Sequence, residues 1–165
     1  MSRIPLPPGD EPENTRAMLL RPAFKEALDQ LERAVWRSEL PRRLHELVRM
    51  RVAKINQCTV CMSWRNPTWC DDEALLAGVD AWATTPGYTD AERVALEYAE
   101  RFCVDSTNID DDLFRRLGDH FDPGMIVDLT LVTGKYLALG RFSQVLGLDQ
   151  ACDLVFDASG TLTRR

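Results

Sequence analysis

The Cys58-Thr59-Val60-Cys61 segment holds the side chains best suited to chemistry in this sequence. Cysteines three positions apart on a helix lie on one face, with roughly 5 to 6 Å between their Cβ atoms, so they can form a disulfide after a small adjustment. At a helix start, free N–H groups and the helix dipole stabilise a thiolate and lower a thiol pKa from about 8.5 to roughly 3.5 to 7.5. The spacing therefore favours a reversible dithiol that attacks a peroxide or a disulfide.

Two other interpretations of this cysteine pair stay open. Cysteine is a small hydrophobic residue that is often buried, so the pair can simply be packed. Half a zinc site is a further option, but it needs a second pair of ligands, and His45 and His120 lie on different predicted helices without ligand spacing. The other cysteines have no partner in sequence, and we expect them to be packing residues: Cys70, Cys103 and Cys152.

Glu46 is a carboxylate that lies 12 residues before Cys58. On one straight helix this separation is roughly 18 Å, which is out of reach of the thiols. Glu46 can serve them only if the chain turns at Asn56-Gln57 and folds back. Without such a turn, it is a solvated or ion-paired glutamate on a helix.

Composition places the chain among single-domain globular proteins. It has 165 residues, of which 45% are hydrophobic, enough to bury a core without disulfides or a structural metal. Four of the nine prolines fall in the first dozen residues, so we expect an extended arm over residues 1–20 and one helical domain over residues 21–160. The odd number of cysteines and the absence of an apolar leader indicate a cytoplasmic, reducing compartment.

Charge and hydropathy argue against two classes of partner. The chain has 26 acidic and 20 basic residues and a net charge of -6, whereas nucleic-acid binders normally show a basic field. The most apolar stretch, residues 125–146, contains Asp128, Lys135 and Arg141, so no membrane span is predicted. We therefore expect neither nucleic acid nor a membrane as a partner.

The domain is predicted to be all-α, because apolar residues recur at helical spacing and no segment shows sustained period-two alternation. A helix over residues 21–36 precedes one that Ser38 caps and that has Pro41 in its first turn. This second helix is apolar on two sides, which predicts a central or interfacial place. A capping box begins at Thr89, and Pro123 opens a last long helix whose nearly continuous apolar surface indicates a core or an oligomer contact.

The run from Glu46 to Cys61 resembles the signature of the AhpD-like, or carboxymuconolactone decarboxylase, family. It contains a glutamate, an Arg-x-Arg-Val-Ala helix, an Asn-x-Cys turn and the dithiol. Two further segments are similar to parts of the family's sequence: the loop and helix over residues 82–100 and the long final helix over residues 126–148. The similarity extends over most of the chain beyond Leu40.

The resemblance implies an AhpD-like helical bundle that assembles into trimers or hexamers, binds no cofactor and reduces hydroperoxides. In that mechanism the second cysteine, here Cys61, attacks the peroxide, and Cys58 then condenses with it to a redox-active disulfide. An external dithiol, in the best understood members a lipoyl-bearing protein, resets the pair. Glu46 would begin a proton relay to the thiol. The helix dipole instead favours Cys58 as the more acidic thiol.

Two positions depart from the family's peroxidase pattern. That pattern has a histidine just before the second cysteine and another four residues after it, where this chain has Val60 and Arg65. Neither side chain can shuttle a proton at neutral pH. Arg65 can stabilise a thiolate if it points back one turn toward Cys61. Alternatively, it is a surface arginine that pairs with Asp71 or Asp72.

These observations predict a thiol-dependent oxidoreductase with an antioxidant role, which uses a hydroperoxide or a disulfide as substrate. Its predicted site consists of Cys61, Cys58, Glu46 and Arg65. One alternative is the ring-lactone decarboxylase branch of the same fold, whose chemistry does not use a cysteine pair. The other is a non-enzymatic, redox-sensing oligomeric module that has kept the dithiol without the histidine relay.

Overall fold

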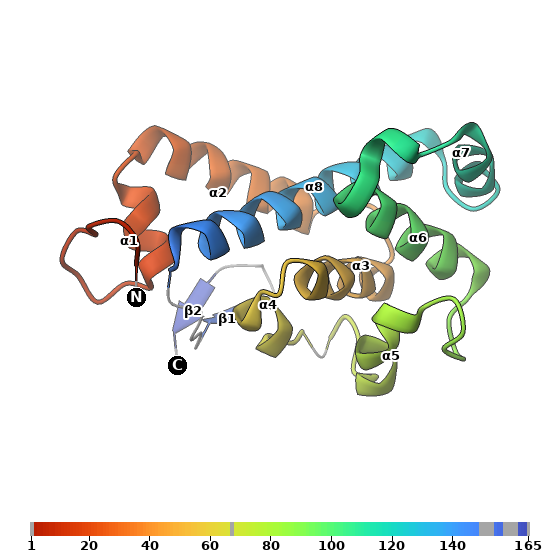
Figure 1. The fold of residues 1–165 in the computed structure, drawn as a ribbon, viewed down its shortest axis with the longest axis horizontal. Coiled ribbons are helices and arrows are strands. Elements are labelled where there is room, and N and C mark those ends of the chain that lie inside the picture. The colour runs from red at the N-terminus through yellow and green to blue at the C-terminus, as the bar shows by residue number, and fades with distance from the viewer. Residues whose placement is uncertain (1, 67, 149–153, 157–161, 165) are drawn as a thin grey trace.

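The structure is a computed structural model, and it describes residues 2–66, 68–148, 154–156 and 162–164 (Figure 1). Within these residues, helices dominate and one short pair of strands follows them. The elements in chain order are α1 (Glu13–Leu19), α2 (Pro22–Trp36), α3 (Arg42–Ile55), α4 (Thr59–Ser63), α5 (Glu73–Gly78), η1 (Val79–Ala81), α6 (Asp90–Asp105), η2 (Ser106–Asn108), α7 (Asp111–Gly118), α8 (Pro123–Leu146), β1 (Leu154–Phe156) and β2 (Leu162–Arg164).

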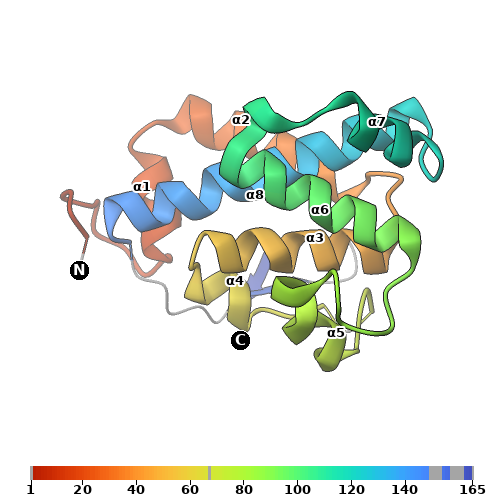
Figure 2. The same ribbon diagram turned by 45° about the vertical axis from the view of Figure 1, so that its right-hand side comes forward.

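Helix α3 is central to the fold. It packs against α6 and α8 and, on its other side, against α4 and α5, while α8 lies between α2 and α3 in both views (Figures 1 and 2). Leu44 and Val48 of α3 enter a large apolar core with α6, α7 and α8. Leu47 and Met50 enter a second apolar core with α5. The predicted packing of this helix on two sides is confirmed.

Side-chain caps determine where several helices begin. The Thr89 hydroxyl accepts a hydrogen bond from the Glu92 N–H at 3.2 Å, and the Glu92 carboxylate accepts one from the Thr89 N–H at 2.8 Å. This is the predicted capping box. Pro123 lies in the first turn of α8, as predicted, and Asp122 caps this helix. Cys58 caps α4, because its sulfur accepts from the Cys61 N–H at 3.4 Å.

The N-terminal segment differs from the predicted arm. Residues Glu13–Leu19 form α1, where the sequence predicts extended chain through residue 20. The four early prolines all precede this helix, and Pro12 stands at its N-cap, so none of them interrupts it. Helix α1 packs against α2. The Arg3 N–H donates to the Leu146 carbonyl at 2.8 Å, which ties the start of the chain to the end of α8.

The start of α3 also corrects an expectation. Pro41 is the N-cap of α3, and Ser38 does not cap it. Ser38 lies four residues before the first helical residue, which is too far for its hydroxyl to reach the free N–H groups of the first turn. Its Oγ instead lies 3.3 Å from Nδ1 of His45.

The predicted all-α class is confirmed for the domain that carries the cysteine pair. The strands in the described part of the chain are β1 and β2, an antiparallel pair in which Val155 lies opposite Thr163; the sequence predicts no strand there. None of the helices among the described residues is long and apolar enough to cross a membrane. Helix α8 is less buried than its composition suggests, since its exposed face carries Val127, Leu131 and Val145.

Candidate functional site

The dithiol lies where the chain turns back from α3. Helix α3 ends at Ile55 with Asn56 as its C-cap, and Gln57 has the left-handed φ of 52° that redirects the chain into Cys58. The two sulfurs form a thiol–thiol hydrogen bond at 2.8 Å, and both thiols are free. The Cys58 residue is 2% exposed, and Cys61 is half-buried. The predicted proximity of the two cysteines is therefore present in the structure.

The two thiols differ in acidity. The hydrogen bond from Cys61 lowers the pKa of Cys58 from 9.0 to about 6, against an opposing effect of burial, with further help from backbone N–H groups and the charge of Arg49. The same hydrogen bond, together with burial, raises the pKa of Cys61. The first proton to leave the pair therefore comes from Cys58, and the Cys61 S–H then donates to the Cys58 thiolate.

A buried ion pair on α3 holds the dithiol helix in place. Arg49 donates to both carboxylate oxygens of Glu46, from Nε at 2.8 Å and from Nη2 at 2.7 Å. Its guanidinium also donates to the Cys61 carbonyl at 2.5 Å and to the Trp64 carbonyl at 3.1 Å. Burial opposes the charge of Arg49, but its hydrogen bonds and attraction to Glu46 raise its pKa above the usual value. Arg49 therefore remains charged.

This geometry changes the role expected for Glu46. The sequence predicts that Glu46 begins a proton relay to the thiols, but in the described structure both of its oxygens accept hydrogen bonds from Arg49. The chain does fold back at Asn56-Gln57, as that role required, and the group that reaches α4 is Arg49. Glu46 thus orients the arginine that anchors Cys61.

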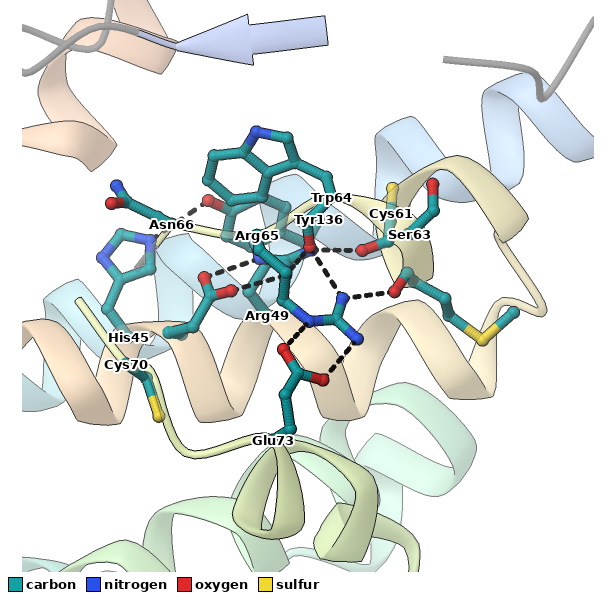
Figure 3. Close-up of polar contacts among 12 residues, drawn as sticks. His45, Arg49, Cys61, Ser63, Trp64, Arg65, Asn66, Cys70, Glu73 and Tyr136 are labelled. Atoms are coloured by element: carbon teal, nitrogen blue, oxygen red, sulfur yellow. Dashed lines mark hydrogen bonds and ion pairs between the residues drawn. The ribbon is translucent and has the colours of Figure 1, made fainter. Parts of the chain in front are cut away.

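Arg65 does not point back to the dithiol as the sequence allowed. Helix α4 ends at Ser63, and Trp64 is extended, so Arg65 is not one helical turn from Cys61. Its Nε lies 2.6 Å from the Glu73 carboxylate, and it also donates to the Met62 and Trp64 carbonyls. Figure 3 shows Arg65 extended toward Glu73, away from the Cys61 sulfur. Glu73, and not Asp71 or Asp72, is its partner.

Both thiols line a pocket of about 180 Å³ between α2, α3, α4 and α8. Its wall is largely aromatic and aliphatic, with two ion pairs beside the sulfurs, and the N-terminal helix α1 contributes one residue. The lining residues are Asn14, Glu32, Trp36, Arg49, Cys58, Val60, Cys61, Trp64, Lys135, Tyr136, Leu139, Gly140 and Ser143.

Lys135 is the pocket's second buried cation. Its side chain is 5% exposed, and its Nζ lies 2.7 Å from a carboxylate oxygen of Glu32 on α2. The same Nζ lies 3.8 Å from the centre of the Tyr136 ring, where the ring face attracts a cation. Burial lowers the pKa of Lys135, while Glu32 and Cys61 raise it.

His45 lies beside this pocket but cannot act as a proton shuttle at neutral pH. It is fully buried, and burial, with the charges of Lys135, Arg42 and Arg49, lowers its pKa to about 3. Its Nε2 lies 3.2 Å from the Tyr136 hydroxyl. A neutral histidine with both ring nitrogens in hydrogen-bonding range has a structural role here.

Sequence reasoning missed three charged pocket residues: Arg49, Lys135 and Glu32. The spacing of Glu46 and Arg49 on one helix was a local signal for their ion pair, because residues three apart share a face. The pairing of Lys135 with Glu32 joins α8 to α2 and leaves no local signal.

The cysteines outside the pair fit the expected packing role where they are described. Cys70 and Cys103 are buried, and Cys152 lies outside the described residues. Burial raises the pKa of Cys103 to about 11, against the charges of Arg141 and Arg51, so this thiol is protonated at neutral pH. No group of three or more metal-ligating side chains occurs within the described part of the chain.

An all-helical domain with a free, polarised dithiol at a helix N-cap defines the class of protein. Residues 22–65, which include the Glu46–Arg49 pair and the dithiol, match the model of the carboxymuconolactone decarboxylase family. The fold is that of AhpD-like proteins. The family match over these residues and the shared fold both support the AhpD-like, carboxymuconolactone decarboxylase resemblance that the motifs predict.

Three relatives illustrate this similarity. An uncharacterized protein of Escherichia coli K12, YnjA, is 35% identical over 117 residues, which cover 68% of this chain and 63% of that protein. A protein of unknown function from Agrobacterium tumefaciens has a TM-score of 0.71 at 22% identity over 92% of this chain and 99% of that chain. An AhpD-core, uncharacterized peroxidase-related protein from Ralstonia eutropha JMP134 has a TM-score of 0.73 at 18% identity, over 90% and 91% of the two chains. The two structures support the fold alone, and this chain spans less than two thirds of the E. coli protein's length.

Proposed function

We propose that this protein is a thiol-dependent oxidoreductase that reduces hydroperoxides with Cys58 and Cys61. The observation that carries the proposal is the 2.8 Å contact between two free thiols that share one pocket. The pKa of about 6 for Cys58 supplies a thiolate at neutral pH, and a thiolate is the nucleophilic form of cysteine. The family match over residues 22–65 and the fold shared with an uncharacterized peroxidase-related protein support the same reaction class.

The reaction has two balanced steps. A cysteine thiolate attacks the terminal oxygen of the hydroperoxide, which oxidises the sulfur to a sulfenic acid and, with one added proton, releases an alcohol. The thiol of the other cysteine then condenses with the sulfenic acid, which forms the disulfide and releases water. An external dithiol reduces the disulfide and becomes a disulfide itself. We propose a lipoyl-bearing protein as this reductant, because the family resemblance implies one.

The contacts favour Cys58 as the attacking sulfur, which reverses the order implied by the family resemblance. The Cys58 sulfur accepts a hydrogen bond from the Cys61 N–H, and its position at the N-cap of α4 favours negative charge. Cys61 keeps its proton, because both burial and the bond to Cys58 raise its pKa. Cys61 is then the resolving thiol.

Stoichiometric oxidation tests the proposal. The full chain is mixed with one equivalent of tert-butyl hydroperoxide, and its peptides are mapped by mass spectrometry. We expect a Cys58–Cys61 disulfide in the wild type and in Cys103→Ala, a matched control that removes another buried thiol. Persistence of both free thiols in the wild type would contradict the proposal.

Trapping of the sulfenic acid assigns the attacking sulfur. With dimedone present, we expect Cys61→Ser to carry an adduct at Cys58 and Cys58→Ser to carry little or none. An adduct found only at Cys61, in the Cys58→Ser protein, would restore the order implied by the resemblance and leave the overall reaction intact.

A further inference from the structure

Lys135 occupies a position that packing alone does not explain. It is a buried charge in the middle of α8, next to the apolar side chains of the core, and its side chain is 5% exposed. Taking an ammonium group out of water costs several kcal/mol unless it is paired. Its partner, Glu32, comes from α2, so two helices combine to place one cation in the wall of the pocket that holds both thiols.

Hydroperoxide reduction needs a proton donor in the pocket that holds the thiols. When the thiolate takes the terminal oxygen, the other oxygen leaves as an alkoxide, a poor leaving group unless an acid protonates it. The family's two histidine positions hold Val60 and Arg65 in this chain, and the pKa of His45 is about 3, so none of these groups supplies that proton at neutral pH.

The other charged and titratable groups of the pocket are committed elsewhere. Arg49 binds Glu46 and two carbonyls, and its pKa is raised. The Tyr136 hydroxyl lies 3.2 Å from His45, and burial raises its pKa. The S–H of Cys61 is needed for disulfide formation. Lys135 lies in the pocket wall and carries an exchangeable proton at the end of a flexible side chain.

We propose that Lys135, positioned by its ion pair with Glu32, is the catalytic acid that protonates the leaving alkoxide during attack by the dithiol. This rests on the proposed hydroperoxide reduction. The Cys58 thiolate, the hydroperoxide and the Lys135 ammonium become the Cys58 sulfenic acid, an alcohol and the neutral Lys135 amine. The sulfur is oxidised by two electrons, which reduce the O–O bond, and the amine recovers its proton from water. Glu32 keeps the lysine protonated before attack, because its charge opposes the effect of burial.

Two oxidants with different leaving groups test this role in the full chain. An alkyl hydroperoxide expels an alkoxide that needs a proton, whereas a peroxyacid expels a carboxylate that does not. We expect Lys135→Met to lower the rate of oxidation by tert-butyl hydroperoxide about 100-fold, within the usual range of general acid catalysis. Its rate with peracetic acid is expected to stay within about threefold of wild type, because only the alkoxide needs the acid. Iodoacetamide alkylation, measured well above the pKa of Cys58, checks that the thiolate is intact.

Matched variants separate this role from a structural one. Lys54→Met removes another ion-paired lysine, 2.8 Å from Asp80 and outside the pocket, and is expected to react as wild type does. Glu32→Gln keeps Lys135 but lowers its pKa. The rate of hydroperoxide reduction falls at high pH as Lys135 loses its proton, so this fall should begin at a lower pH in the variant than in the wild type. If Lys135→Met fails to fold, Lys135→Arg replaces it as a variant that keeps the positive charge. It should still lose rate with tert-butyl hydroperoxide but not with peracetic acid, because arginine is a poor acid.

The outcomes distinguish the two proposals. A wild-type protein that does not react with tert-butyl hydroperoxide would overturn the proposed function itself. A reactive wild type with equal rates in Lys135→Met would overturn only the role of Lys135. Equal losses with both oxidants would also overturn it, since they would indicate a damaged thiolate.

Discussion

At the scale of single residues, the dithiol depends on a buried arginine that binds the backbone of its helix. Arg49 is almost fully buried, and it connects Glu46 on α3 with the backbone carbonyls of Cys61 and Trp64. Charge-assisted hydrogen bonds of this kind are short and directional. They hold the C-terminal half of α4, which carries Cys61, against α3.

The acidity of Cys58 gives a prediction at this scale. Replacing Cys61 with alanine removes the S–H donor, so we expect the pKa of Cys58 to rise from about 6 toward its ordinary 9.0. The pH dependence of iodoacetamide alkylation at Cys58 measures this change. Cys103→Ala is the control, and a midpoint near pH 6 in both variants would contradict the assigned hydrogen bond.

The same difference in acidity makes stability depend on pH. The folded pKa of Cys58 lies below its unfolded value of 9.0, so its contribution is fully present above pH 9 and is lost as pH falls through about 6. The folded pKa of Cys61 lies above its unfolded value of 9.0. Its contribution to stability is therefore fully present below pH 9 and is lost as pH rises above 9. We expect the urea midpoint to rise between pH 6 and 9, with a smaller rise in Cys58→Ser.

Sequence reasoning located the reactive pair because both cysteines belong to one local motif. Local spacing placed the pair at the start of a helix, and the helix dipole favoured Cys58 as the more acidic thiol. It did not predict the partners of Glu46 and Arg65, since each partner depends on contacts that the motif does not specify. Arg65 in particular follows an extended residue, so the rule for helical neighbours did not apply to it.

At the scale of elements, α3 and α8 approach closely at Gly140. A side-chain Cβ at this position would overlap the Asn56 amide nitrogen and lie 3.0 Å from its Cγ. The Asn56 amide donates to the Tyr136 carbonyl at 3.1 Å, which links the end of α3 to α8 just before the dithiol. The absence of a side chain at Gly140 therefore permits this contact between α3 and α8 beside the pocket.

Substitution of Gly140 tests this contact. We expect Gly140→Ala to destabilise the protein by about 1–3 kcal/mol, the usual cost of overpacking a closely packed site. Gly118→Ala on α7 is the matched control, because an added Cβ there meets no atom within 4 Å. A helical Gly→Ala change without a clash is neutral or stabilising, by roughly 0.5–1 kcal/mol. Urea unfolding of both variants measures the difference, and equal midpoints would contradict the proposed close approach.

At the scale of the whole molecule, the pocket combines side chains from five helices. Periodicity and caps predicted most helices because these signals are local, as at Thr89 and Asp122. The pocket was not predictable in this way, because Glu32 and Lys135 are about a hundred residues apart in sequence. Helix α1 was not predicted because it is short and follows a proline-rich segment. Its stability comes from packing on α2, which the local sequence does not indicate.

The exposed face of α8 carries apolar side chains that suit a contact between subunits. Val127 is 57% exposed and Leu131 is 53% exposed, and with Val145 they lie on one face of a helix that is otherwise largely packed. We propose that a second copy of this chain covers this face, as the homo-oligomers implied by the family resemblance would require. Exposed apolar stripes of this kind mark protein contacts.

We expect Leu131→Glu to shift the protein toward a smaller assembly in analytical ultracentrifugation, because a carboxylate would be buried without a partner at the contact. Ala83→Glu, at an exposed loop position, should leave the sedimentation coefficient unchanged. Unchanged circular dichroism would show that the variant subunit still folds. Because the pocket forms within one subunit, the smaller assembly should still form the Cys58–Cys61 disulfide with hydroperoxide. A wild-type protein that sediments as a monomer, or an unchanged assembly in Leu131→Glu, would contradict the assignment of this face.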